Sequence, residues 1–262
     1  MRIAYLSLTA AIAFAAMAPV SATAGEPAAE QTTSSAIADA VATPDRPEDA
    51  RKLDESRKPV EVLTFLGLEE GMAATDVMTG SGYWAEIMGH AVGSTGSVIA
   101  LEPTQFYNEE KQGADWQNLQ SRAPAVALKT YSFEAFSYPA DSFDFAIINL
   151  SYHDIYWESV KYNIPKSDPD KFTNGLYAAM KPGGIVGVID HVGEGDDTRA
   201  LVDKMHRIDP AVVRADFERA GFVLEAESDL LTNPDDDHTK GVFDASIRGK
   251  TDRFLMKFRK PR

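Results

Sequence analysis

Asp76-Val77-Met78-Thr79-Gly80-Ser81-Gly82-Tyr83-Trp84 is the stretch of sequence that decides the fold of this chain. It follows a short apolar segment and precedes an amphipathic one, so we expect it to connect a strand to a helix. Gly80 and Gly82 allow the backbone to turn tightly and to approach a ligand closely. The helix that follows would offer unpaired N–H groups to a carboxylate or a phosphate. The sequence therefore predicts a ligand site at this turn, formed by Asp76, Thr79, Gly80 and Gly82.

Strand and helix patterns alternate around the turn. Strands are predicted over 73–78, 97–101, 126–130, 143–150 and 185–190, and helices over 45–66 (broken near Pro59), 83–92, 108–122 and 168–180. Because parallel neighbours need crossover connections, this order predicts a Rossmann-like, doubly wound, mostly parallel sheet with helices on both faces. Helices over 198–205 and 211–220 and strands over 222–231 and 253–258 follow. They complete an α/β sheet of seven strands whose last strand is antiparallel.

The first 24 residues have the pattern of a signal peptide. Arg2 is their only charge, an apolar stretch runs over 3–20, and Ala22-Thr23-Ala24 has the small side chains that a signal peptidase accepts. A retained membrane anchor is the competing interpretation, but Pro19 and the Ala-rich composition favour cleavage after Ala24. We therefore expect an exported protein, periplasmic or secreted, that is not stably inserted in a membrane after cleavage.

Composition limits the remaining possibilities. Residues 25–44 have few large apolar side chains and are predicted to be a flexible linker, which leaves 45–262 as one folded domain. The chain has no Cys, so packing and not disulfides must stabilise it. Its formal net charge of −14 repels phosphate backbones, which argues against a nucleic-acid substrate. Small molecules, lipids and proteins remain as partners.

Glu102 ends the second predicted strand and could accept hydrogen bonds from both hydroxyls of an adenosine ribose. With the glycine turn and four further segments, it makes the sequence resemble the class I S-adenosylmethionine-dependent methyltransferases, and in particular an exported bacterial group of predicted methyltransferases. The resemblance covers about residue 45 to the C-terminus. It rests on DVMTGSGYW (76–84), VIALEP (98–103), FSYPADSFDFAIINLSYHD (136–154), MKPGGIVGVIDH (180–191), HRIDPAVV (206–213) and RGKTDRFLMKFRKP (248–261).

The resemblance implies S-adenosylmethionine as the cofactor and methyl transfer as the reaction. In this family the glycine turn would hold the amino-acid part of the cofactor, Glu102 the ribose, and the stretch after the third strand the adenine. Two positions depart from the family pattern: Met78 replaces the first glycine of the turn, and Ser132 replaces the acidic residue beside the adenine. Ser132 and Asn149, at the end of the fourth strand, complete the predicted cofactor residues.

The acceptor is expected beyond the carboxyl ends of the fourth and fifth strands, where open parallel sheets bind ligands. When an acceptor is a hydroxyl, methyl transfer requires alignment and removal of a proton. His153 or His191 could be the base and Asp154 or Asp190 could orient it. Tyr152, Tyr156 and Trp157 could line the cavity or contact the sulfonium by cation–π attraction; alternatively these aromatic side chains belong to the core.

Two further charged segments have a structural and a functional interpretation. His206 and Arg207 could contact the substrate, but cationic residues at a helix C-terminus are also expected for stability alone. Asp235-Asp236-Asp237 with His238 could suggest a metal, yet consecutive acids lack the alternating spacing of a calcium loop. We expect a solvated loop there and no metal site.

Two alternative functions remain open on the sequence. An inactive methyltransferase fold could bind a nucleoside-like or other small ligand outside the cytoplasm, and Met78 in the turn favours this. A nicotinamide dehydrogenase also places an acid after its second strand, and Ala85 is tolerated at the third glycine position of its fingerprint. The two late strands and the family resemblance argue against the dehydrogenase.

Overall fold

The computed structural model describes residues 28–262, with side chains described from residue 34 onward. The predicted signal peptide therefore lies outside the described residues. The N-terminal half contains α1 (Ala28–Val41), α2 (Glu48–Arg51), α3 (Asp54–Arg57), α4 (Pro59–Leu66), β1 (Ala73–Val77), α5 (Tyr83–Ala91), β2 (Ser97–Pro103), α6 (Glu109–Arg122) and β3 (Val126–Tyr131). The C-terminal half contains β4 (Phe143–Asn149), η1 (Tyr152–Tyr156), α7 (Pro169–Ala179), β5 (Met180–His191), α8 (Thr198–Met205), α9 (Pro210–Ala220), β6 (Val223–Ser228) and β7 (Arg253–Arg259).

The seven strands form one sheet in the order β3-β2-β1-β4-β5-β7-β6. Strands β1 to β5 are parallel, and β7 runs antiparallel to both of its neighbours, β5 and β6. Strands β2 and β3 lie on one side of β1, and β4 and β5 lie on its other side. The order in which strands are added therefore reverses at β1. The predicted fold class is confirmed, because the sheet is mostly parallel, carries helices, and has as its antiparallel strand β7, the last strand of the chain.

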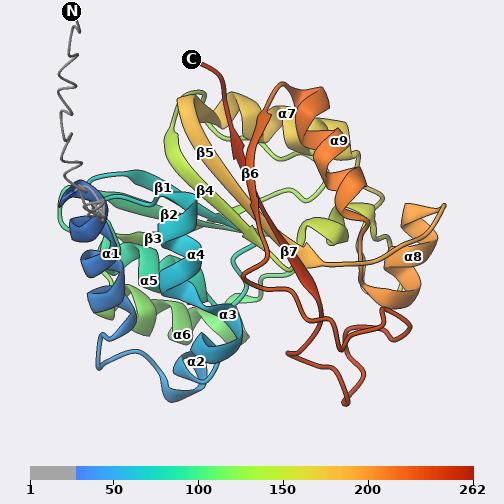
Figure 1. The fold of residues 1–262 in the computed structure, drawn as a ribbon, viewed down its shortest axis with the longest axis horizontal. Coiled ribbons are helices and arrows are strands. Elements are labelled where there is room, and N and C mark those ends of the chain that lie inside the picture. The colour runs from blue at the N-terminus through green and yellow to red at the C-terminus, as the bar shows by residue number, and fades with distance from the viewer. Residues whose placement is uncertain (1–27) are drawn as a thin grey trace, which may run out of the picture.

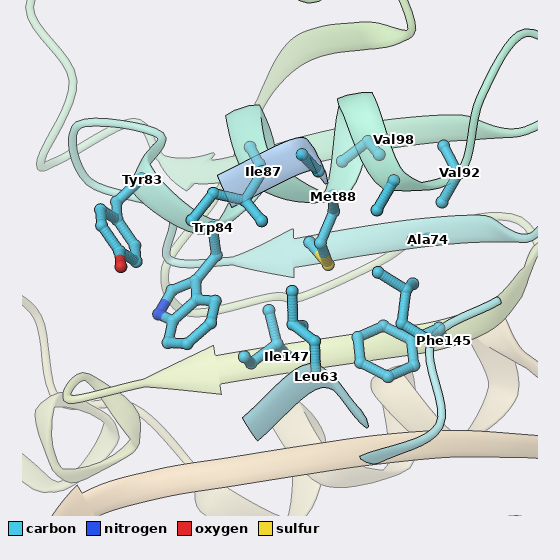
Figure 2. Packing of buried hydrophobic residues seen from close by; sticks show 14 of the residues in the cluster. Leu63, Ala74, Tyr83, Trp84, Ile87, Met88, Val92, Val98, Phe145 and Ile147 are labelled. Carbon is cyan, nitrogen blue, oxygen red and sulfur yellow. The ribbon is translucent and has the colours of Figure 1, made fainter. Parts of the chain in front are cut away.

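Helices cover both faces of the sheet (Figure 1). On one face, α1, α4, α5 and α6 enclose a hydrophobic core in which Trp84, Ile87 and Met88 of α5 lie over Ala74 and Ile147 in the sheet (Figure 2). On the other face, α7, α9 and η1 enclose a second core rich in Phe. Strands β1 and β4 are buried on both faces, which explains why the sequence of β4 is almost continuously apolar.

The expectation of a flexible linker over 25–44 is wrong for α1. This helix packs on α4 and α5, and its Ile37 and Ala40 are buried in the core beside them. The sequence of α1 is rich in small residues and has only this narrow apolar side, so its composition resembles that of a linker. Contacts with the folded domain, which composition does not reveal, account for the helix.

Most predicted boundaries agree with the structure to within one or two residues, and two strands differ more. Strand β5 begins at Met180, because Met180 pairs with Phe143 before a register shift brings Ile185 opposite Phe145. The predicted turn at 181–184 therefore lies inside the strand as an irregularity. Strand β6 ends at Ser228, three residues earlier than expected. Among the described residues, no helix is both long and apolar enough to cross a membrane.

Candidate active site

The turn between β1 and α5 is fixed by a buried carboxylate. Asp76 Oδ2 accepts hydrogen bonds from the Thr79 hydroxyl, at 2.6 Å, and from the backbone N–H of Ala85, at 3.1 Å. Burial raises the pKa of Asp76 to about 7, although these two hydrogen bonds oppose the rise. The side chain of Asp76, the first residue of the motif, therefore stabilises the turn from its buried side.

Glu102, at the end of β2, lies beside this turn. Its Oε2 accepts a hydrogen bond from the backbone N–H of Gly80, at 2.9 Å, while Oε1 has no hydrogen-bond partner among the described residues. Burial raises the pKa of Glu102 to about 7, and the nearby carboxylate of Asp154 acts in the same direction. Oε1 of Glu102 is thus left for a ligand. The contact also joins Gly80 and Glu102, two residues that the sequence predicted to act at one site.

A cavity of about 300 Å³ opens between the turn and the ends of β2 and β4. The predicted cofactor residues that line it are Asp76, Thr79, Gly80, Glu102 and Asn149. Two predicted cofactor residues lie outside its lining. Gly82 (φ +79°) packs instead against α6, since a Cβ there would lie 2.5 Å from Leu119, and Ser132 is an exposed residue.

The same cavity contains polar groups without partners. Trp84 Nε1 and Ser151 Oγ are buried in its wall, and neither has a hydrogen-bond partner among the described residues. Buried donors of this kind are costly unless a ligand or water satisfies them. Together with the unused oxygen of Glu102, they form a donor and acceptor set that fits a polar ligand such as an adenosine with an amino-acid tail.

Arg57, the last residue of α3, lines this cavity as well and has no hydrogen-bond or ion-pair partner among the described side chains. Its guanidinium lies over the ring of Tyr83, 4.3 Å from the centroid. Burial lowers the pKa of Arg57, opposed by Tyr83, Asp76 and Asp54. A half-buried guanidinium that makes no hydrogen bond or ion pair with the described side chains is positioned to bind an anionic group of a ligand.

A larger cavity, of about 780 Å³, adjoins the first. The two share Arg57, Phe106, Leu150 and Asp154 in their linings. The larger one lies under the long segment between β6 and β7. Its wall combines three His, three Arg, one Asp and several large apolar side chains. Among the residues predicted for catalysis and substrate binding, those that line it are His153, Asp154, Trp157, His191 and His206.

His153 is held between two carboxylates. Its Nδ1 lies 2.8 Å from Asp190 Oδ1, its backbone N–H donates to Asp190 Oδ2 at 2.9 Å, and its Nε2 lies 3.4 Å from Asp154 Oδ1. Burial alone would lower the pKa of His153, but Asp190 and Asp154 raise it to about 9. Asp190 lies behind His153, outside the cavity lining, and therefore acts by orienting the ring.

The other two histidines of the cavity are neutral at physiological pH. Burial lowers the pKa of His191 to about 3, and its Nδ1 lies 2.7 Å from the Thr251 hydroxyl. Burial and the neighbouring His153 lower the pKa of His206, whose ring packs between Trp157 and Phe243. The three histidines thus differ in charge because their surroundings differ.

Besides Asp190, three predicted substrate residues, Tyr152, Tyr156 and Arg207, lie outside the linings of both cavities. The hydroxyls of Tyr152 and Tyr156 both donate to Asp216 Oδ2 of α9, at 2.7 and 2.5 Å. Arg207 is fully buried, with bidentate hydrogen bonds to Asp236 and further bonds to two backbone carbonyls. These groups already have partners, so they serve the packing of η1, α9 and the segment before β7. Asp236 belongs to the acidic segment for which no metal was expected.

Sequence reasoning missed Arg57, Phe106, Ser151 and Trp84 as lining residues. Trp84 and Ser151 lie inside quoted motifs, so their proximity to the turn and to the end of β4 was a usable signal. Arg57 and Phe106 carry no such signal, because only the folding of α3 and of the segment after β2 brings them to the cavity.

Comparison with known proteins finds a family model that matches part of the chain. The family model for protein-L-isoaspartate(D-aspartate) O-methyltransferase (PCMT) matches residues 58–121, the segment that contains β1, the glycine turn and Glu102. No curated protein matches the chain significantly.

Among solved structures, an S-adenosylmethionine-dependent methyltransferase from Aquifex aeolicus is similar, with a TM-score of 0.56 and 22% identity over 82% of this chain and 98% of that one. Another from Mesorhizobium loti gives a TM-score of 0.53 and 17% identity, over 79% and 99%. The (4+2)-cyclase SpnF gives 0.55 and 17%, over 90% and 97%.

These similarities identify the architecture. The chain has the fold of the class I S-adenosylmethionine-dependent methyltransferases, as the resemblance of its motifs implied. Because a cyclase has a similar fold, the reaction must be argued from the site. The antiparallel β7, inserted between β5 and β6, also departs from the six-stranded order typical of dinucleotide-binding domains.

Proposed function

We propose that this chain is an exported S-adenosylmethionine-dependent methyltransferase that acts on a small-molecule or lipidic acceptor. The observation that carries the proposal is the pairing of Gly80 with Glu102 in one cavity, which adjoins a second, larger cavity at Asp154. A donor site and an acceptor site that share part of their linings are the arrangement that transfer between two bound molecules requires.

The smaller cavity and its rim fit the cofactor. Glu102 would accept hydrogen bonds from the ribose with its unused oxygen, and the turn at Gly80 would lie against the amino-acid part. Arg57 would hold the carboxylate of that part, because its guanidinium contacts the ring of Tyr83 but makes no hydrogen bond or ion pair with the described side chains. Phe106 offers an apolar face to the adenine where the two cavities meet. When bound, the cofactor supplies an electrophilic methyl group on a sulfonium.

The side chains at the junction would act on the acceptor. Asp154 lines both cavities, and burial raises its pKa, so it is placed to receive a proton from an acceptor hydroxyl. Because Asp190 and Asp154 raise the pKa of His153, its imidazole is the protonated partner of these two carboxylates. We therefore assign His153 to positioning Asp154 and to balancing the negative charge. His191 and Trp157 would contact the acceptor from the wall.

The lining of the larger cavity supports the choice of acceptor. Its apolar side chains, from Leu53, Trp157, Val242 and Phe243, would bury a hydrocarbon or aromatic body, while the charged groups would contact a polar end. The net charge of −14 disfavours a polyanionic substrate such as a nucleic acid. Export follows from the signal-peptide pattern of residues 1–24, so the acceptor would be met outside the cytoplasm.

Binding and turnover of the purified domain test the proposal. Isothermal titration with S-adenosylmethionine and with its demethylated product is expected to give micromolar dissociation constants. Incubation of methyl-labelled cofactor with small aromatic hydroxy acids and with membrane-lipid extracts is expected to yield a labelled product. Absence of binding at millimolar ligand would refute the assignment of the cofactor.

A non-catalytic ligand-binding function is the second candidate, and Met78 is the observation that favours it. Met78 has a left-handed backbone (φ +55°) where the family pattern has glycine, and its side chain lines the smaller cavity. Binding of the demethylated product without labelled product from any acceptor would support this function instead.

A further inference from the structure

We propose that His153, Asp154 and His206 form a binding site for a first-row divalent metal ion such as Zn²⁺. One ligand atom of each residue lies within 4.8 Å of the other two. Asp154 Oδ1 is 3.4 Å from His153 Nε2 and 3.9 Å from His206 Nδ1. Ligands at about 2.1 Å from a tetrahedral ion lie about 3.4 Å apart, so His206 must move inward to hold such an ion.

The surroundings of His153 match those of a metal ligand. A ligating imidazole usually donates its other ring N–H to a carboxylate, which fixes the tautomer and the orientation of the ring. Asp190 supplies this partner at Nδ1, 2.8 Å away, and is itself fully buried. Because Asp190 also accepts the backbone N–H of His153, the ring is fixed with Nε2 directed toward Asp154.

His206 is held in place by its backbone and by its neighbours. It caps α8 in the left-handed conformation (φ +51°), which ends the helix and is uncommon outside glycine. Its ring contacts Trp157, Phe243 and the ring of His153, with centroids 5.3, 5.0 and 5.5 Å apart. These contacts leave Nδ1 on the side of Asp154.

The donor set indicates the kind of ion. Two imidazole nitrogens and one carboxylate oxygen suit Zn²⁺, Fe²⁺, Co²⁺ or Mn²⁺ better than Ca²⁺ or Mg²⁺, which prefer oxygen ligands. Three protein ligands leave at least one coordination position open. All three ligands line the larger cavity, so an open position would be reached from this cavity, where the acceptor is proposed to bind.

The consequence for catalysis rests on the proposed function. An acceptor hydroxyl or thiol bound to the ion would release its proton to solvent more readily, since a bound divalent ion lowers the pKa of its ligand. The acceptor's oxygen or sulfur would then form a bond to the methyl carbon as the carbon–sulfur bond of the sulfonium breaks. His153 and Asp154 would serve this reaction by holding the ion.

Metal titration of the tag-free, chelator-treated protein tests the site without cofactor or acceptor. Isothermal titration with Zn²⁺ and the visible absorption of Co²⁺ are expected to show one equivalent bound with tetrahedral or five-coordinate character. Asp154→Asn and His206→Asn should weaken binding roughly 100-fold or more, and Asp190→Asn about 10–100-fold. Asparagine is chosen at 206 because it tolerates the left-handed backbone.

His238→Asn is the matched control, because His238 has a left-handed backbone (φ +59°) like that of His206 and lies outside both cavities. It should bind the ion as the unaltered protein does, and circular dichroism should show all variants folded. Binding that is substoichiometric, or that survives both Asp154→Asn and His206→Asn in folded protein, would overturn the metal site. That outcome leaves the methyltransferase proposal intact, since cofactor binding is measured separately.

Discussion

The backbone N–H of Gly80 donates a hydrogen bond to Oε2 of Glu102, 2.9 Å away, and so ties the turn after β1 to the end of β2. The two strands are parallel neighbours, with Val77 opposite Leu101, which brings their carboxyl ends to the same edge of the sheet. Register alone therefore places the glycine turn beside the carboxylate. The free oxygen of Glu102 is then the acceptor on which ligand affinity should depend.

Glu102→Gln should weaken binding of S-adenosylmethionine by about 10–100-fold. A hydrogen bond to a charged group contributes about 1.5–3 kcal/mol, and the neutral amide replaces that charge. Because the pKa of Glu102 is raised to about 7, affinity of the unaltered protein should increase between pH 6 and pH 8 as the carboxylate ionises. Isothermal titration at both pH values measures the two effects.

The variant should lose this pH dependence together with its affinity. Glu134→Gln provides the control, because Glu134 is exposed and follows β3 outside both cavities. Equal affinities for Glu102→Gln and the unaltered protein would show that the ribose does not bind here.

Asp76 should make the ligand-free protein less stable as pH rises from about 4 to 7. Its pKa is raised by burial to about 7 in the folded state, so over this range the folded protein keeps a proton that the unfolded chain has lost. The free energy of unfolding should fall by about 3–4 kcal/mol between pH 4 and pH 7, since one pKa unit is worth about 1.4 kcal/mol.

Asp76→Asn should flatten this decline, because the amide does not titrate. Urea unfolding at pH 5, 6 and 7.5 gives the slope for both proteins. Identical slopes would mean that Asp76 is ionised throughout, and that its bonds to Thr79 and Ala85 outweigh its burial.

The two glycines of the turn should respond differently to alanine. At Gly82 a Cβ would lie 2.5 Å from Leu119 and 2.8 Å from Trp116, so Gly82→Ala should destabilise the fold by about 2–4 kcal/mol. At Gly80 (φ +60°) a Cβ meets nothing within 4 Å and lines the smaller cavity. Gly80→Ala should cost about 1 kcal/mol of stability yet weaken cofactor binding about tenfold.

Thermal unfolding and cofactor titration of the two variants separate these roles. The reverse pattern, in which Gly82→Ala is stable but does not bind the cofactor, would show that Gly82 belongs to the cofactor site, as the sequence predicted.

The sheet was predictable because its signals are local. Apolar runs, glycine turns and helix caps are read within a few residues, and α8 begins and ends at the predicted residues, Thr198 and Met205. Helix α1 was not predictable, because Ile37 and Ala40 become a buried side only when α4 and α5 are present. The pairing of Gly80 with Glu102 was predictable because strand order places both at one edge.

The acceptor side was predicted less well, because the roles of its side chains depend on distant partners. Tyr152 and Trp157 look alike in the sequence, as aromatic residues after a buried strand. Asp216, 64 residues after Tyr152, draws that tyrosine into the core, whereas Trp157 lines the cavity. Arg207 likewise pairs with Asp236, which lies 29 residues later in a segment that looks solvated.

Tyr156→Phe should therefore lower stability without affecting the site. The lost hydrogen bond to the Asp216 carboxylate should cost about 1–3 kcal/mol in the free energy of unfolding. Cofactor affinity and the rate of methyl transfer should stay unchanged. Trp157→Phe, which alters the cavity wall, is the contrasting variant and should raise the KM for the acceptor. Loss of turnover in Tyr156→Phe, with stability retained, would place its hydroxyl in the reaction.

Substitution of Arg57 should affect binding of the amino-acid end of the cofactor but not binding of its nucleoside end. If the Arg57 guanidinium holds the cofactor carboxylate, Arg57→Gln should weaken binding of S-adenosylmethionine by about 10–100-fold, the value of a charge-assisted pair. Adenosine lacks that carboxylate, so its affinity should not change. Arg51→Gln, an exposed residue of α2, controls for net charge. Because Arg57 also lines the larger cavity, a rise in the acceptor KM with unchanged cofactor affinity would assign it to an anionic acceptor instead.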